Sequence, residues 1–482
     1  MGTRPRRGER AGKLSIPRVV GTVAFAAGIG FVAGSAWLRA GASDDEAVFG
    51  EAAAVSADAP AATGPLEVGP EPSLRPPPSM IFESFPASRE EFERAAGHLA
   101  LEPSPGTRAP WDPARLVEWV EPPGYRTDLS GPLRVEFSMD VELSREILKL
   151  LKRGRVANGH VIVMEPETGR ILAYVSTDPE RFPGTAAYPA ASLVKIVTAA
   201  AALDGAPQAA RETCRYRGSP YRLTPSRVHP PRRGNTMTLE RSLATSNNQC
   251  FAQLAVNAVG SERMIAAIQS CGWLSEPAPG HQAGTATAGD DDYNLGRLGC
   301  GLAGCRITPL HAAQLAGVLA HGRLVEPWWI ERVVDVHGRA LPLPTPRPSR
   351  RVMRRHLAEE LREMLVRTTT RGTARSAFRD RRGRRRLGDV KVAGKTGNLT
   401  GDEPHGRYEW FVGVAPAENP TVAVAVLQLQ SDLWWVRSSE LGANVLSEIF
   451  CEKRDCRPEL ADRYVKGPRE PTAPVGESLL GG

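Results

Sequence analysis

Three short groups of residues could do chemistry together, and the first is Ser192-Leu193-Val194-Lys195. On a helix, positions i and i+3 lie on the same face, so the Lys195 amine can reach the Ser192 hydroxyl. A serine hydroxyl is a weak nucleophile until a neighbouring base takes its proton. A lysine in a partly buried, positive site can have its pKa lowered enough to be that base. The pair therefore predicts nucleophilic chemistry at Ser192.

The second group is Ser246-Asn247-Asn248 and the third is Lys395-Thr396-Gly397. They add a proton relay and an anion site. Ser246 can pass a proton between the lysine and a leaving amine, and Asn248 can hold both the lysine and a substrate carbonyl. Lys395 and Thr396 offer a cation and a hydroxyl to a carboxylate, and Gly397 lets a substrate backbone approach closely. Each group alone is common, and a Ser/Asn-rich stretch is often only a turn. The three groups occur in a fixed order, with spacings of 54 and 149 residues.

The surrounding pattern indicates which elements carry these groups. Ser192–Leu203 is apolar nearly all round and predicts a buried helix, Thr238–Val259 predicts one or two helices, and strands are expected at Val390–Ala393 and Trp410–Val414. Strands at both ends of the region bracket a block of helices. This arrangement predicts an α+β fold (an α/β sandwich) with a central, mostly antiparallel sheet flanked by helices. The other predicted helices are Val141–Lys152, Leu310–Ala320, His356–Val366 and Ser438–Phe450, and the other strands are His160–Met164, Ile171–Val175 and Thr421–Leu429.

The N-terminal region predicts a membrane anchor. Val19–Leu38 contains no charged residue, and a helix of that length would cross a hydrocarbon core of roughly 30 Å. Basic residues precede it and acidic residues follow, so the rest of the chain is expected outside the cytoplasm, on a single-pass transmembrane helix in the cytoplasmic (inner) membrane. The alternative is a signal peptide cleaved near Ala40-Gly41-Ala42, but signal h-regions are shorter, about 7–15 residues.

The predicted organisation follows from these patterns. Residues 1–18 form a basic cytoplasmic segment, 19–38 the anchor, 39–130 a Pro-rich periplasmic spacer, 131–456 the catalytic domain and 457–482 a flexible tail. The net charge of +7 is concentrated at 1–18 and 379–386, which disfavours a nucleic-acid-binding surface.

Cysteine and glycine spacing excludes several site classes. Seven cysteines fit an oxidising compartment, and two pairs are close enough in sequence to bond, Cys300 with Cys305 and Cys451 with Cys456. Neither C-x-x-C nor H-E-x-x-H occurs, so no metal site is predicted. Residues 299–304 fit G-x-G-x-x-G, but no strand precedes them, which disfavours a nucleotide site.

The ordered set S-x-x-K, S-x-N and K-T-G resembles the superfamily of penicillin-binding proteins and serine β-lactamases. Its flanks, residues 159–173, 308–314, 371–374 and 410–416, are similar to those of penicillin-binding transpeptidase domains. The resemblance covers about residues 131–450. It departs from the family at Asn398, where Thr or Ser is usual, and at Ala191, where Gly is usual.

The resemblance implies a mechanism at the first two motifs. Ser192 would attack the D-Ala–D-Ala carbonyl of a peptidoglycan stem peptide, or a β-lactam, with Lys195 as the acylation base. Ser246 would carry a proton to the leaving D-Ala, and Asn248 would position it. An amine from another stem peptide would then resolve the acyl-enzyme and form a cross-link.

At the third motif, the resemblance implies substrate binding by Lys395, Thr396, Gly397 and Asn398. The backbone N–H groups of Ser192 and Asn398 would form the oxyanion hole. No metal or organic cofactor is implied. Residues 39–130 are too few for a glycosyltransferase domain, so a glycosyltransferase is expected as a separate partner.

The predicted function is therefore a penicillin-binding serine D,D-transpeptidase. A D,D-carboxypeptidase is the first alternative. A β-lactamase is the second, for which no deacylation base can be assigned, and a catalytically silent scaffold or sensor is the third. The Arg-rich run 379–386 is expected to be an exposed insertion, with contact to an anionic wall polymer as its alternative role.

Overall fold

A computed structural model describes residues 115–120, 133–335, 340–341, 343, 346–430 and 435–467. These residues all belong to the larger of two compact units, residues 58–482. Among them, no helix is both long enough and apolar enough to cross a membrane. The predicted segments 1–18 and 19–38 and most of the predicted spacer lie outside the described residues.

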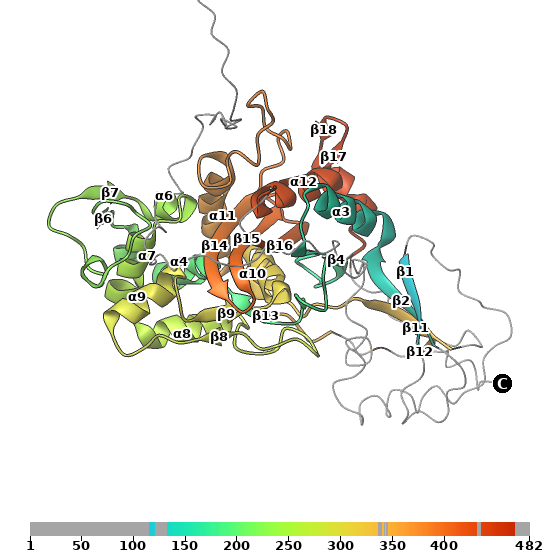
Figure 1. Ribbon diagram of the computed structural model, residues 1–482, viewed down its shortest axis with the longest axis horizontal. Coiled ribbons are helices and arrows are strands. Elements are labelled where there is room, and N and C mark those ends of the chain that lie inside the picture. The colour runs from blue at the N-terminus through green and yellow to red at the C-terminus, as the bar shows by residue number, and fades with distance from the viewer. Residues whose placement is uncertain are drawn as a thin grey trace, which may run out of the picture. The chain divides into compact units, whose positions relative to one another are not determined.

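A five-stranded sheet forms the centre of the fold, in the order β14-β15-β16-β3-β4. Every neighbouring pair is antiparallel. The sheet combines strands from both ends of the region, as the sequence predicts (Figure 1). Its strands are β3 (Asn158–Met164), β4 (Ile171–Ser176), β14 (Ala393–Asp402), β15 (His405–Ala415) and β16 (Val422–Gln430).

Side chains on β15 alternate between two hydrophobic clusters, because successive residues of a strand point to opposite faces. On β15, Trp410 and Val412 belong to one cluster and Phe411 belongs to the other. Helices α3 (Val141–Arg153) and α12 (Ser438–Phe450) pack on the second face, with buried residues that include Leu143 and Leu446. The predicted α+β architecture is confirmed: an antiparallel sheet is covered by helices on both faces.

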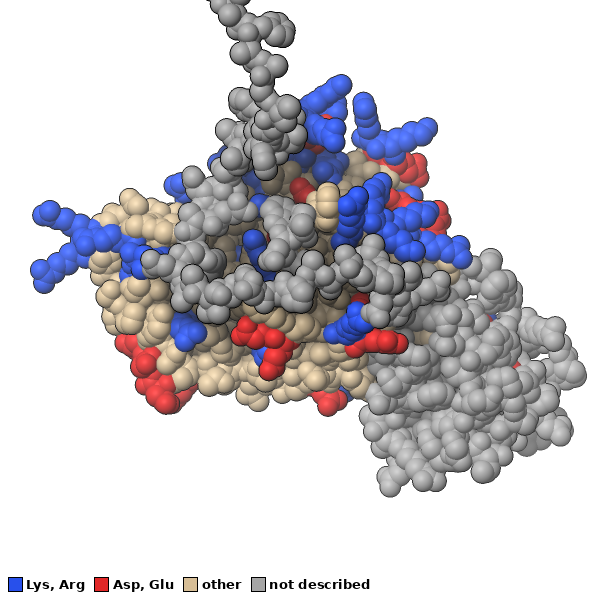
Figure 2. Space-filling view, in the orientation of Figure 1, with Lys and Arg blue, Asp and Glu red and all other residues tan. Residues whose placement is uncertain are grey.

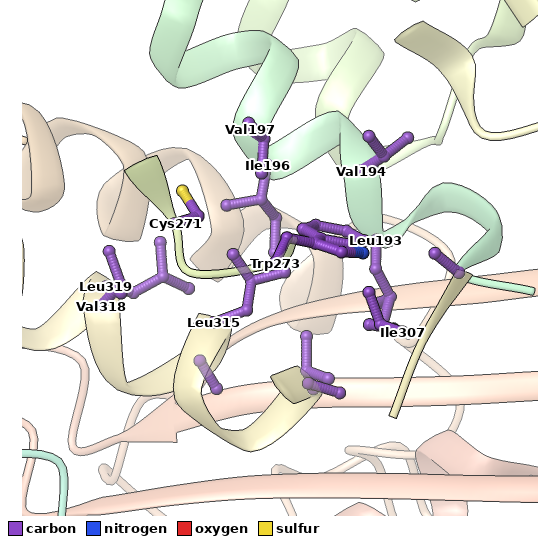
Figure 3. Packing of buried hydrophobic residues seen from close by; sticks show 14 of the residues in the cluster. Leu193, Val194, Ile196, Val197, Cys271, Trp273, Ile307, Leu315, Val318 and Leu319 are labelled. Carbon is purple, nitrogen blue, oxygen red and sulfur yellow. The ribbon is translucent and has the colours of Figure 1, made fainter. Parts of the chain in front are cut away.

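A block of helices covers the face of the sheet opposite to α3 and α12, and α4 (Val194–Gly205) lies at the centre of this block. Residues Val194 to Leu203 of α4 are all buried, which explains its lack of a polar stripe. Figure 3 shows Ile196 of α4 and Leu315 of α10 (Pro309–His321) converging on the ring of Trp273. The other described helices are α5 (Pro207–Arg211), α6 (Leu239–Ala244), α7 (Asn248–Leu254), α8 (Ser261–Ser270), α9 (Asp292–Cys300), α10 (Pro309–His321) and α11 (Arg355–Thr370).

Short elements complete the described chain. Short segments of 3₁₀ or π helix occur at η1 (Ala191–Leu193), η2 (Pro225–Arg227), η3 (Ala255–Val259) and η4 (Pro458–Arg463). A second sheet has the order β1-β2-β11-β12, and β1 falls within the residues predicted as a spacer. Its strands are β1 (Arg115–Val120), β2 (Leu133–Asp140), β11 (Ile330–Val334) and β12 (Ala340–Leu341). The remaining short strands are β5 (Tyr188–Pro189), β6 (Cys214–Tyr216), β7 (Asn235–Met237), β8 (Thr285–Ala286), β9 (Cys305–Ile307), β10 (Arg323–Leu324), β13 (Arg350–Arg351), β17 (Cys451–Glu452) and β18 (Asp455–Cys456).

Two predictions need correction. The predicted strand Val390–Ala393 is wrong, because β14 begins only at Ala393 and contains the K-T-G motif itself. The apolar residues Val390 and Val392 instead pack into the second hydrophobic cluster from a loop. Because they are apolar in order to be buried, these loop residues resemble a short strand in the sequence.

The second correction concerns the disulfides. Cys451–Cys456 forms as predicted, but Cys300 and Cys305 are free and buried, as is Cys271. Closeness in sequence does not orient two side chains: Cys300 ends α9, where its thiol lies 3.6 Å from the Arg297 carbonyl, and Cys305 begins β9. A second disulfide, Cys214–Cys250, instead joins β6 to α7 across 36 residues.

The buried ring of Phe411 gives a test of this packing. Its side chain is fully buried on β15, with its ring centroid 5.6 Å from that of Phe378. Phe411→Ala should lower the free energy of unfolding by about 3–5 kcal/mol, because the lost apolar contacts leave a cavity. Urea denaturation measures the change.

The matched control is Trp435→Ala, which removes a ring that is 57% exposed and contacts the Arg155 guanidinium at 4.1 Å. Its cost should stay below about 1 kcal/mol. Equal losses from the two variants would contradict the assignment of Phe411 to the core.

Candidate active site

The segment that presents Ser192 is fixed from two sides. Trp410 on β15 donates from Nε1 to the Pro189 carbonyl at 2.8 Å, and the Ala190 N–H donates to the Cys305 carbonyl at 3.0 Å. Ser192 follows in η1, immediately before α4, and is half-buried. The hydroxyl is thus held at the start of a buried helix, where the sequence predicts it.

The residue before the serine has a strained backbone. Ala191 has φ +48°, a left-handed conformation that costs a residue with a side chain of the order of 1 kcal/mol or more. Gly301 packs against it with φ +78°, and a Cβ at that position would lie only 2.0 Å from the Ala191 carbonyl oxygen. The tight turn therefore requires glycine at 301, whereas alanine is accommodated at 191.

Lys195 lies at the centre of a hydrogen-bonded group that joins the first two motifs. Its Nζ is 2.7 Å from Ser192 Oγ, 3.1 Å from Ser246 Oγ and 2.6 Å from Asn248 Oδ1. The Ser246 carbonyl lies slightly farther away, at 3.3 Å. The lysine is completely buried, and the Phe251 ring centroid lies 5.8 Å from its nitrogen.

Burial makes the uncharged form of Lys195 accessible near neutral pH. Desolvation lowers its pKa from 10.5 to about 8, against a smaller opposing effect of Cys300. The neutral amine has two N–H donors and one lone pair. The donors can bond Asn248 Oδ1 and Ser246 Oγ, which leaves the lone pair for the proton of Ser192. The neighbouring side chains therefore match the basic form of the lysine.

The second motif lies in the turn between α6 and α7. Ser246 has φ +58°, and Asn247 caps α7 by accepting a bond from the Cys250 N–H. Asn248, the first residue of α7, donates from Nδ2 to the Tyr221 carbonyl at 2.8 Å, which turns its amide oxygen toward Lys195. The disulfide of Cys250 ties this helix to β6.

The third motif lies within β14, and its lysine is turned inward. Lys395 is fully buried, and its Nζ donates to Ser246 Oγ at 3.0 Å and to the Thr396 carbonyl at 2.7 Å. Desolvation lowers its pKa well below the ordinary value, and the charge of Lys195 lowers it further. Both lysines therefore meet at one hydroxyl, that of Ser246.

The residues that follow Lys395 lie on the edge strand β14, next to the serine segment. Gly397 lies close to the serine segment, since a Cβ there would be 3.4 Å from the Ser192 backbone nitrogen. Thr396 is half-buried, and its hydroxyl lies 2.5 Å from that of Thr373. Asn398 is exposed, and its Oδ1 accepts a bond from Arg407 Nε at 2.9 Å.

The structure brings the predicted residues of all three motifs into one site, but sequence reasoning missed several of their neighbours. Thr373, which contacts Thr396, lies in the flanking segment 371–374. The similarity of that segment to the family is the signal that could have identified this residue. The Tyr221 carbonyl and the Phe251 ring belong to no motif that could reveal them. No group of three or more His, Cys, Asp or Glu residues is placed to hold a metal ion in the described part of the chain.

The backbone at Ala191 gives a stability test of this site. Ala191→Val should lower the free energy of unfolding by about 2 kcal/mol or more, because a β-branched residue is poorly tolerated at positive φ. Ala191→Gly is the control and should change stability by less than about 1 kcal/mol, because relief of strain offsets the more flexible unfolded chain. If chemical denaturation shows valine to be as well tolerated as glycine, the left-handed conformation of Ala191 is wrong.

Comparison of the sequence with known proteins identifies a matching family. The penicillin binding protein transpeptidase domain family matches residues 159–450. Among curated proteins, the peptidoglycan D,D-transpeptidase PbpA of Mycolicibacterium smegmatis is 28% identical over 315 residues, covering 56% of this chain and 61% of the relative. PbpA of Mycobacterium tuberculosis is 26% identical over 309 residues, with the same coverage.

Solved structures share the fold. The crystal structure of PBPA from M. tuberculosis has a TM-score of 0.53 at 22% identity and covers 65% of this chain and 81% of that one. Its ceftriaxone acyl-enzyme complex has a TM-score of 0.55 at 22% identity, over 66% and 80% of the two chains.

The chain spans about 61% of the length of the curated relatives that it matches. The family match itself covers more than half of the chain and includes all three motifs. The chain therefore belongs to the penicillin-binding protein transpeptidase domain family.

Proposed function

We propose that this chain is a peptidoglycan D,D-transpeptidase that acts through an acyl-enzyme on Ser192. The observation that carries the proposal is the position of Lys195 Nζ, 2.7 Å from Ser192 Oγ and 3.1 Å from Ser246 Oγ. The similar curated proteins are D,D-transpeptidases, and similar solved structures include β-lactam acyl-enzymes of PBPA.

Acylation begins with proton transfer from Ser192 to the neutral amine of Lys195. The serine oxygen attacks the carbonyl of a D-Ala–D-Ala peptide, and the negative charge that develops on the carbonyl oxygen is stabilised by the backbone N–H groups of Ser192 and Asn398. The short distance between Gly397 and the Ser192 backbone supports this pairing, because it holds the β14 backbone against the serine segment.

Collapse of the intermediate breaks the peptide bond and releases D-Ala. The leaving nitrogen needs a proton, which Lys195 returns through the hydroxyl of Ser246. Lys395 donates to that same hydroxyl at 3.0 Å, and this hydrogen bond stabilises the Ser246 oxygen as its proton moves toward the leaving group. Asn248 keeps Lys195 in place by accepting a bond from it.

Thr396, Gly397 and Asn398 bind the terminal carboxylate side of the substrate. Lys395 is buried beneath them, and its hydrogen bonds to Ser246 Oγ and to the Thr396 carbonyl hold this part of β14 in place. The Thr396 hydroxyl is hydrogen-bonded to the Thr373 hydroxyl, and the Asn398 side chain accepts a hydrogen bond from Arg407. We infer that Asn398 and Arg407 together replace the hydroxyl that is usual after K-T-G.

The surroundings of Ser192 disfavour rapid hydrolysis of an acyl-enzyme. Among the described residues, no Asp or Glu side chain hydrogen-bonds or ion-pairs with Ser192, Lys195 or Ser246. A β-lactamase must activate water to hydrolyse its acyl-enzyme quickly, and a carboxylate base is one way to do so. Its absence from these contacts supports a long-lived adduct with a β-lactam.

We further propose that the chain is anchored by residues 19–38 and works outside the cytoplasm, with a separate glycosyltransferase supplying glycan strands. The hydrophobic pattern of that segment and the flanking charges support the anchor. The disulfides Cys214–Cys250 and Cys451–Cys456 fit an oxidising compartment.

The proposed reaction is tested by labelling the protein with a fluorescent penicillin. The wild type should form a covalent adduct that persists, and Ser192→Ala should reduce labelling by at least about 10³-fold because no other nucleophile replaces the serine. With a D-Ala–D-Ala stem peptide and an acceptor amine, the released D-Ala should be matched by cross-linked product.

Three other results would overturn the proposal in different ways. Fast release of the hydrolysed drug would indicate a β-lactamase. Release of D-Ala with water as the only acceptor would indicate a carboxypeptidase. Equal labelling of the wild type and Ser192→Ala would remove Ser192 from the mechanism.

The pKa of Lys195 predicts the pH dependence of acylation. Since only the amine form accepts the serine proton, the acylation rate should rise about tenfold per pH unit below pH 8 and level off above it. A lysine with the ordinary pKa of 10.5 would keep the rate rising to that pH, and such a profile would contradict the assignment.

Unfolding at each pH is the control for that profile. The pKa of Lys195 is lower in the folded than in the unfolded state, so this group makes the folded state more stable as the pH rises from about 8 to 10.5. Deprotonation of Lys195 therefore does not unfold the protein above pH 8, and unfolding caused by this group cannot explain the plateau in the acylation rate.

A further inference from the structure

A second cavity lies apart from the Ser192 site, between the C-terminal end of α11 and the loop that leads into β14. It has a volume of about 610 Å³, within the range of small-molecule sites. No Asp or Glu lines it. Six cationic residues do: Arg367, Arg371, Arg375, Arg379, Arg385 and Lys391.

Half of these cations have acidic partners. Arg367 bonds Glu240 at 2.8 Å, Arg385 lies 3.7 Å from Asp389, and Lys391 pairs with Glu418. For Arg371, Arg375 and Arg379, the described residues provide no carboxylate partner. Like charges that share one cavity repel each other, so an anion bound among them would be favoured.

The surface around the cavity is strongly basic. In Figure 2, Lys and Arg side chains gather along the upper part of the view, where the segment between α11 and β14 lies in Figure 1. That segment includes the Arg-rich run 379–386, which is largely exposed, as the sequence predicts. Asp380 in this run is already paired with Arg384 and does not line the cavity.

The floor of the cavity is apolar. Phe378, Leu387, Val390 and Val392 line it and are themselves buried. A ligand that fits must combine a strong anion with a less polar body. A phosphate ester has this chemistry, because its terminal oxygens accept bonds from several guanidinium groups while the attached sugar or glyceryl group covers the floor.

We propose that this cavity is a binding site for a phosphate ester, separate from the site of acyl transfer. One wall of the site is continuous with the catalytic strand: Thr369 of α11 donates to the Val392 carbonyl at 2.8 Å, and β14 begins at the next residue. Bound phosphate would therefore lie beside the start of the strand that carries Lys395.

Binding to the full-length protein can be measured by isothermal titration calorimetry with three small probes. Glucose 1-phosphate tests a sugar phosphate, and dihexanoylphosphatidic acid tests a lipid headgroup. Glucuronate, a sugar of similar size with a carboxylate, tests whether phosphate is required. The phosphate probe that binds more tightly identifies the source of the ligand, and both phosphates should bind at least about tenfold more tightly than glucuronate.

The test variant is Arg375→Glu/Arg379→Glu, which reverses two cavity charges that have no carboxylate partner among the described residues. It should weaken binding of the phosphate probe at least about tenfold. The control Arg232→Glu/Arg233→Glu makes the same change of charge at residues between β6 and β7, away from the cavity lining, and should change the affinity by less than about threefold.

The single variant Arg375→Glu keeps the test valid if the double variant is unstable, because Arg375 is exposed. Labelling of Ser192 by penicillin verifies that each variant is folded and is independent of phosphate binding. The proposal is overturned if the cavity and control variants weaken binding equally, if glucuronate binds as tightly as the phosphates, or if neither phosphate binds.

Discussion

The contact on which the rest of this structure depends is the burial of the Lys195 amine between two serine hydroxyls and an asparagine oxygen. A buried ammonium group would require a carboxylate close by, and the amine instead has neutral partners from three elements. Desolvation lowers the pKa of Lys195 and thereby makes the basic form of the lysine available near neutral pH.

The fold maintains that environment by placing the site where three parts of the chain meet. The buried helix α4 supplies Lys195, the turn between α6 and α7 supplies Ser246 and Asn248, and the edge strand β14 supplies Lys395. Each is anchored by contacts of a different kind: apolar packing around α4, a disulfide on α7 and the β-ladder of β14 with β15. The charge of Lys195 lowers the pKa of Lys395, and Lys395 donates to the Ser246 hydroxyl that the two lysines share.

Much of this could be predicted from the sequence because motif order and hydrophobic periodicity are local signals. Helix Ser438–Phe450 has its predicted limits, and the residues of all three motifs meet as expected. What could not be predicted depends on packing between distant segments. Val390 and Val392 are buried in a loop, Cys214 pairs with Cys250 across 36 residues, and the inward orientation of Lys395 follows from its contact with Ser246. The left-handed backbone of Ala191 has no signature in an alanine.

The most direct test of the central claim is an NMR titration of the lysine side chains, with ¹³C at Cε. One resonance should titrate near pH 8 and be absent from Lys195→Gln, which keeps a side chain of similar length without a titrating amine. If the resonance lost in Lys195→Gln titrates at about 10.4, like that of an exposed lysine, Lys195 is an ordinary ammonium group at neutral pH. In that case another group must take the proton of Ser192, and the role of Lys195 as the acylation base is contradicted.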